Sequence, residues 1–246
     1  MSYSFKELDL KESYDSSTDD LINDFYISVL ENSKSYDRIA GFFSSSSLAI
    51  AARGIAGLII NEGKMRILTS PKLSPEDIEA ITSSKNDYES YLERNLLAEI
   101  SNIENEFEQN YCKALGWMLA KGLLEIKIVY SIDDNNRIQN MNLFHQKVGL
   151  LKDMDGNNIS FSGSINESAS GWLNNIEEFK VFREWLPGQK VYFDSDNKRF
   201  NELWEGSRNN IKVVDIPQAV KDHLIEFSKD FRIEKLAISQ YFKMRK

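Results

Sequence analysis

Histidine, cysteine and proline are scarce in this chain, which has 246 residues but only two His, one Cys and four Pro. The single cysteine, Cys112, cannot form an intrachain disulfide, and no second thiolate is available for a zinc site. We therefore expect a protein of the reducing cytoplasm. Because His, Cys and Asp do not cluster, the sequence also predicts a site without a metal and without another cofactor.

Long apolar runs are missing as well. The runs LAIAA at 48–52 and AGLII at 56–60 are far shorter than the roughly 20 residues that a membrane-spanning helix needs. The chain begins MSYSFKELDLKES, which is polar and acidic, whereas a secretory signal begins with basic residues and continues with apolar ones. We expect no membrane partner.

Acidic residues exceed basic ones, 38 to 30, which gives a formal net charge of -8. Such a charge argues against a surface that attracts nucleic acid everywhere, so any phosphate binding has to be local. Apolar residues make up 41% of the chain, enough for the core of one large domain.

Segments with the periods of strands and helices alternate along the chain. Strands are expected at 64–70, 123–131, 146–151, 159–162, 179–182 and 212–214. Helices are expected at 48–60, 74–81, 87–119 (long or broken), 198–205 and 218–227. The order predicts an α/β layered fold. No linker rich in Pro or Gly is visible, so we expect one domain over 1–246, with a helical insertion around 74–121 and a C-terminal helical segment at about 197–246.

Four serines, at 44–47, follow the apolar run 36–43 and precede the first of these helices. Serine hydroxyls accept hydrogen bonds from the free backbone N–H groups of a helix start, so capping is the favoured reading. A turn that lines a cleft is the alternative.

His145 and Lys147 are two residues apart in a segment that reads as a strand. On a strand their side chains point the same way, whereas on a helix they diverge. The next strand leads into Gly163-Ser164-x-Asn166, where the glycine allows a sharp turn and a helix start follows. The N-terminus of a helix is a good binding site for a phosphate. Ser164 and Asn166 can donate hydrogen bonds to the phosphate, and Lys147 adds positive charge.

His145 is then a candidate nucleophile toward phosphorus, provided that an acceptor holds its second ring nitrogen. Glu177 is the candidate acceptor, and Glu178 is the alternative. A second histidine is needed to protonate the leaving oxygen.

This pattern resembles the active-site signature of the phospholipase D superfamily, and above all its nuclease branch. The matching positions are His145-x-Lys147, Gly163-Ser164-x-Asn166 and Glu177. The resemblance implies that the histidine is the nucleophile, that the lysine and asparagine bind phosphate, and that the glutamate orients the histidine. It also implies a phospholipase D-like layered mixed sheet flanked by helices. The stretches DRIAGFFSSSSL and GKMRILTSPKLSPEDIEAI extend the likeness to domains of bacterial restriction endonucleases and of DEAD/DEAH-type helicases.

Two departures from the signature are visible. The family places an aspartate five residues after the lysine, where this chain has Lys152, with Asp153 one step late. The motif also occurs once, because His223 lies in a helix-like segment with no lysine two residues on. Family members with one motif pair two chains about a twofold axis, so a homodimer with a shared site is implied.

We accordingly expect a metal-independent phosphodiesterase, a DNA endonuclease that forms a covalent phosphohistidine. A local basic cleft is expected to combine Lys147 with Arg183, Lys180 or Arg53. The alternative is a catalytically silent module that binds nucleic acid and targets a helicase or another subunit of a restriction or defence complex. A phospholipase or a small-molecule phosphodiesterase is the third possibility.

Overall fold

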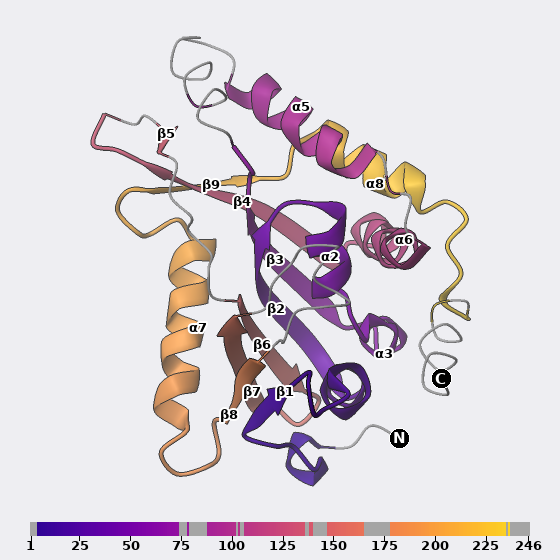
Figure 1. Cartoon of the computed structure of the whole chain (residues 1–246), viewed down its shortest axis with the longest axis vertical. Coiled ribbons are helices and arrows are strands. Elements are labelled where there is room, and N and C mark those ends of the chain that lie inside the picture. Colours follow the sequence, from indigo (N-terminus) through magenta and orange to yellow (C-terminus); the bar gives the residue numbers. More distant parts are fainter. Residues whose placement is uncertain are drawn as a thin grey trace.

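A mixed β-sheet forms the centre of the molecule (Figure 1). The computed structural model describes residues 4–73, 78, 88–101, 103, 106–135, 138–139, 147–164, 178–234 and 236. The strands within these ranges are β1 (Ser13–Asp15), β2 (Ser33–Phe42), β3 (Lys64–Ser70), β4 (Leu124–Ile132), β5 (Ile138–Gln139), β6 (Lys147–Asp153), β7 (Asn158–Ser164), β8 (Glu178–Arg183) and β9 (Ile211–Asp215). Their order in the sheet is β1-β8-β7-β6-β2-β3-β4-β5, and β9 also pairs with β4.

The centre of the sheet is parallel and its flanks are antiparallel. Strands β2, β3 and β4 run in parallel, whereas β6, β7, β8 and β1 on one side and β5 and β9 on the other pair antiparallel with their neighbours. Parallel neighbours need crossover connections, and here helices supply them. The ends of β2 and β3 therefore meet the start of β6 at one edge of the sheet.

Helices cover the two faces of the sheet unequally. The helical segments are η1 (Phe5–Glu7), η2 (Leu21–Ile27, a π-helix), α1 (Ser28–Leu30), α2 (Ser45–Ala51), α3 (Ile55–Ile60), α5 (Tyr88–Ser101), α6 (Glu106–Ala120), α7 (Lys190–Trp204) and α8 (Gln218–Phe227). Figure 1 shows α7 on one side of the sheet and α2, α3, α5, α6 and α8 on the other. We call these sides the α7 face and the core face.

An aromatic cluster anchors the core face. Phe161 on β7 lies 5.2 Å, between ring centroids, from both Phe25 of η2 and Phe179 of β8. All three rings are almost fully buried. Side chains alternate along a strand, so the neighbours of each core-facing residue point to the α7 face. On that face Val148, Leu150 and other apolar residues form a smaller hydrophobic cluster under α7.

The α/β class and the mixed sheet flanked by helices are confirmed. Strand β3 has the predicted bounds, and β4, β6, β7, β8 and β9 differ from prediction by one or two residues at their ends. The helix expected at 198–205 is wrong at its start, because α7 begins at Lys190. The helical stretch expected at 87–119 consists of α5 and α6. The single-domain organisation stays a prediction.

Candidate active site

Lys147 is the first residue of β6 and lies at the edge where β2 and β3 end. Its neighbour Val148 pairs with Ile39 of β2, and Lys147 itself pairs with Gly163 of β7. The lysine is only 8% exposed. The prediction that this position belongs to a strand is confirmed, while His145 lies outside the described residues.

The face on which Lys147 lies follows from the alternation of β6. Lys147 shares its side of the strand with Gly149 and Leu151, and Leu151 belongs to the main hydrophobic core. The lysine is thus on the core face, at the end of a strand whose other core-facing positions are apolar. A cation in this position needs anionic or polar partners at the edge of the sheet.

Gly163 is required by the close approach of β7 and β8. A Cβ atom built on it would lie 2.2 Å from the backbone oxygen of Glu178 and 2.7 Å from the Cα of Phe179. Ser164, the last residue of β7, pairs with Glu178. The structure therefore brings the backbone of Lys147, Gly163 and Ser164 together at one edge. Asn166 and Glu177 lie outside the described residues, and the predicted roles of Ser164 and its neighbours stay predictions.

Glu178, the alternative partner for the histidine, is wrongly placed for that role. Phe179 points into the core, so Glu178 points to the opposite face. Its carboxylate forms an ion pair with Lys180 of the same strand, and half of its side chain is exposed. The role of Glu177 stays a prediction, because this residue lies outside the described ones.

The departure from the family signature at residue 152 has a structural explanation. Lys152 is five residues from Lys147 on the same strand and so points to the α7 face. Asp153 is on the core face but at the far end of β6, where it accepts hydrogen bonds from the backbone N–H of Phe5 at 2.8 Å and of Asn157 at 2.8 Å. Burial alone would raise the pKa of Asp153, but a hydrogen bond from the side-chain amide of Asn157, together with these two backbone hydrogen bonds, holds the pKa below its usual value. Neither residue is near Lys147.

Arg38 is a second cation on the core face that the sequence analysis missed. It pairs in register with Gly149, one core-facing position along β6 from Lys147, and it is fully buried. Its guanidinium lies 4.9 Å from the ring centroid of Phe161. The signal was an arginine inside the apolar run YDRIAGFF. Two buried cations therefore lie on adjacent strands of the core face.

The serine run caps a helix, as expected, and also binds a buried acid. The hydroxyl of Ser44 accepts a hydrogen bond from the backbone N–H of Ser47 at 3.1 Å. Ser45 and Ser46 donate to the carboxylate of Glu108 on α6, at 2.5 Å and 2.9 Å. The capping interpretation is confirmed, and two further hydroxyls connect α2 to α6.

The prediction of a basic cleft is wrong for two of its residues, Arg183 and Lys180. Arg183 pairs in register with Ile159, at the other end of β7 from Gly163, and binds the backbone oxygen of Leu10. Lys180 is on the α7 face with Glu178. Arg53 is buried in the turn after α2.

The described part of the chain holds no group of three or more His, Cys, Asp and Glu side chains placed to bind a metal ion. None of its helices combines the length and the apolar character needed to cross a membrane.

Comparisons with known proteins give only remote likenesses. No protein-family model and no curated protein matches the chain. Among solved structures, phosphatidylserine synthase from Haemophilus influenzae Rd KW20 aligns with 93% of the chain at 14% identity and a TM-score of 0.43. The archaeal chromatin protein TrmBL2, described as showing a novel mode of DNA binding, aligns with 82% at 14% identity and a TM-score of 0.38. The chain covers 46% and 55% of these two structures. Both TM-scores are too low to establish a shared fold.

Proposed function

We propose that the chain is a metal-independent phosphodiesterase of the phospholipase D type that cleaves DNA. The observation that carries this proposal is the position of Lys147, a buried cation at the edge of the sheet, beside the Gly163-Ser164 strand end. The sequence places His145 two residues before the lysine and Asn166 two residues after Ser164. Arg38 adds a second buried positive charge on the same face.

In the proposed reaction, the unprotonated ring nitrogen of His145 attacks phosphorus. A phosphorus–nitrogen bond forms, the bond to the leaving oxygen breaks, and the partner's His145 gives its proton to that oxygen. Water then attacks phosphorus, the phosphorus–nitrogen bond breaks, and the partner's His145 takes a proton from the water. Lys147 and Asn166 bind the non-bridging oxygens, whose negative charge grows in the transition state.

A homodimer follows from this chemistry, because the reaction needs two histidines at one phosphorus and the chain has one such motif. The other histidine, His223, lies on α8 at a partly exposed position. It is therefore the natural control residue.

The first test is cleavage of plasmid, single-stranded DNA and RNA in excess EDTA. We expect the wild-type chain and His223→Ala to cut DNA equally, whereas His145→Ala loses activity by about a thousandfold or more. Lys147→Met should lose a similar factor and also bind DNA more weakly. Activity that EDTA abolishes would contradict the proposal. Binding without cleavage by the wild-type chain would favour a silent targeting module instead.

The second test concerns the shared site. Heterodimers of one wild-type and one His145→Ala chain, purified through two different affinity tags, should be almost inactive if each phosphorus needs both histidines. About half of the activity should remain if each chain has its own site. Heterodimers that carry His223→Ala in place of His145→Ala should be fully active. A strict monomer at micromolar concentration would overturn the shared site.

A further inference from the structure

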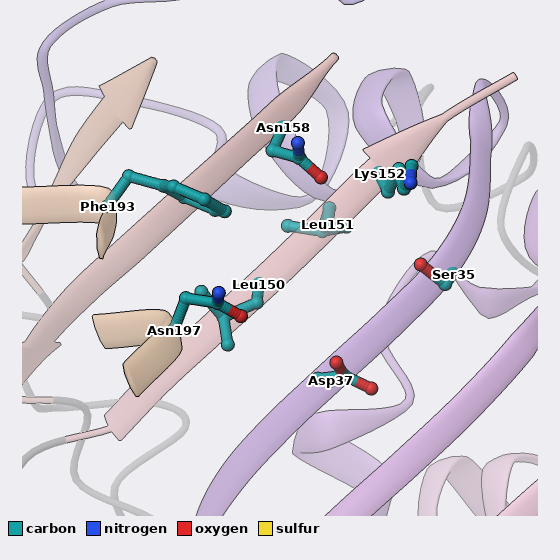
Figure 2. Close-up of a pocket in the computed structure, with 8 residues that line it drawn as sticks. All are labelled: Ser35, Asp37, Leu150, Leu151, Lys152, Asn158, Phe193 and Asn197. Carbon is teal, nitrogen blue, oxygen red and sulfur yellow. The ribbon is translucent and has the colours of Figure 1, made fainter. Parts of the chain in front are cut away.

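A cavity lies on the α7 face of the sheet, under α7 (Figure 2). It has a volume of about 320 Å³. The lining residues come from β2, β6, β7 and α7 and are Ser35, Asp37, Leu150, Leu151, Lys152, Asn158, Phe193 and Asn197. Because Lys152 and Lys147 point to opposite faces of β6, this cavity is separate from the candidate active site.

Strand register brings the polar side chains of the cavity together. Ser35 pairs with Lys152, and Lys152 pairs in turn with Asn158, so these three form one row across β2, β6 and β7. Asp37 and Leu150 form the next row. In Figure 2 all five side chains surround one space. The mouth is polar, while Leu150, together with Phe193 of α7, forms an apolar floor.

The side-chain amides of Asn158 and Asn197 each have one hydrogen-bonding atom left for a ligand. Asn158 donates from its Nδ2 to Glu184 at 2.9 Å and to the backbone oxygen of Gly156 at 3.2 Å. Asn197 accepts at its Oδ1 from Asn201 at 3.1 Å. No described residue uses the Oδ1 of Asn158 or the Nδ2 of Asn197. The cavity therefore offers one acceptor on β7 and one donor on α7.

The charges of the cavity favour an anion. Asp37 is held by Arg66 through two hydrogen bonds, at 2.7 Å and 2.6 Å, so its negative charge is compensated. Arg66 in turn lies against the rings of Phe200 and Trp204 of α7. Lys152 forms no ion pair with any described residue and is exposed at the mouth. One positive charge remains for a ligand.

We propose that this cavity binds a nucleoside monophosphate. A base has both donors and acceptors on its edge, which match the free atoms of Asn197 and Asn158, and its faces suit an apolar floor. The phosphate lies at Lys152, at the exposed mouth of the cavity. The volume falls within the usual range of small-molecule sites. The proposal does not depend on the proposed nuclease activity.

Titration calorimetry of the full chain with adenosine, guanosine, cytidine and uridine 5′-monophosphates tests the site, with adenosine and inorganic phosphate as partial ligands. We expect at least one nucleotide to bind, with about tenfold or greater losses of affinity for Lys152→Gln and for Asn197→Leu. Lys64→Gln, an exposed lysine next to Ser35 on β3, is the matched control and should bind normally.

Further variants separate this site from the candidate active site. Lys147→Met and His145→Ala should leave nucleotide binding unchanged, whereas loss of binding in either would assign the nucleotide to the active site and overturn the proposal. No binding of any nucleotide would also overturn it, as would phosphate alone binding as tightly as the nucleotide. If the chain proves to have no nuclease activity, the calorimetric result still decides this proposal by itself.

Discussion

The two faces of the sheet differ in how completely helices cover them. The core face is covered by α2, α3 and α6, and its centre consists of aromatic rings that pack edge-to-face or tilted against Phe161. A single long helix, α7, covers the other face, and the contacts there include the Asp37–Arg66 pair and a hydrogen bond from Ser160 to Asp196 at 2.8 Å. The core face is packed with apolar side chains, whereas the α7 face combines a smaller apolar cluster with polar contacts and a cavity.

The comparison also separates two lysines of one strand. Lys147 and Lys152 are both on β6, but the first is buried at the end of the core face and the second is exposed on the α7 face. Alternation along the strand assigns them to different sites. A buried cationic side chain needs anionic or polar partners, whereas an exposed one can be solvated by water.

The largest expected effect is on the reactivity of the Cys112 thiol, which reports how accessible the core face is to reagents. Cys112 of α6 is fully buried, and burial raises the pKa of its thiol to about 12. At a fixed pH near 8, the thiolate fraction falls by about three orders of magnitude relative to a free cysteine. A thiol reagent such as DTNB should therefore react with Cys112 only after unfolding by denaturant. Rapid stoichiometric reaction of the native chain would show that α6 does not seal this face.

Truncation of one aromatic ring on each face compares their packing directly. Phe161→Ala should lower the free energy of unfolding by about 4 kcal/mol, because it removes a fully buried ring from the aromatic cluster. Phe193→Ala on α7 should cost about 2 kcal/mol, since it borders a cavity that water can enter. Urea unfolding at constant protein concentration measures both. Equal losses would mean that the α7 face is packed as tightly as the core face.

Arg66→Lys tests the polar contacts under α7. The substitution keeps the charge but loses the two parallel hydrogen bonds to Asp37 and the flat contact with the rings of α7, so we expect a loss of about 1 kcal/mol. Lys64→Arg, at an exposed position of the same strand, is the matched control and should change stability little. If both variants unfold at the same urea concentration as the wild type, the pair does not hold α7 to the sheet.

The smallest expected effect is a change in pH dependence at Asp196. Burial raises the pKa of this carboxyl, although the hydroxyl of Ser160 and nearby Arg199 oppose the shift. Ionisation therefore favours unfolding: the cost is absent below the pKa of the unfolded state and complete above the pKa of the folded state. Asp196→Asn should gain stability relative to the wild type as the pH rises through that window.

Ser160→Ala should change the pH dependence of stability in the opposite direction to Asp196→Asn. It removes a hydrogen bond that stabilises the ionised carboxylate, so the stability of this variant should fall more steeply with rising pH than that of the wild type. Unfolding curves collected across the acidic range measure both slopes. If the stability of all three proteins changed with pH at the same slope, Asp196 would be excluded as a cause of the pH dependence.

Much of the fold was predictable because its signals are local. The alternation in KMRILTS and LLEIKIVYS identified two central strands, and the four serines at 44–47 indicated the cap of α2, although this helix begins at Ser45 and not at 48. The start of α7 was missed because the apolar residues there, Val191, Tyr192 and Phe193, are consecutive and so do not show the spacing of a helix. Strand β1 was missed because three residues carry no period.

The sequence by itself determined that Lys147 belongs to a strand, that Gly163 lies near the end of the next strand, and that the class is α/β, since each depends on residues close in the chain. Only the tertiary structure decided which residues from distant segments meet. Arg38 contacts Phe161, Glu108 accepts from Ser45, and residues of α7 close a cavity over β2 and β6. These contacts depend on strand order and register, which local periodicity does not specify.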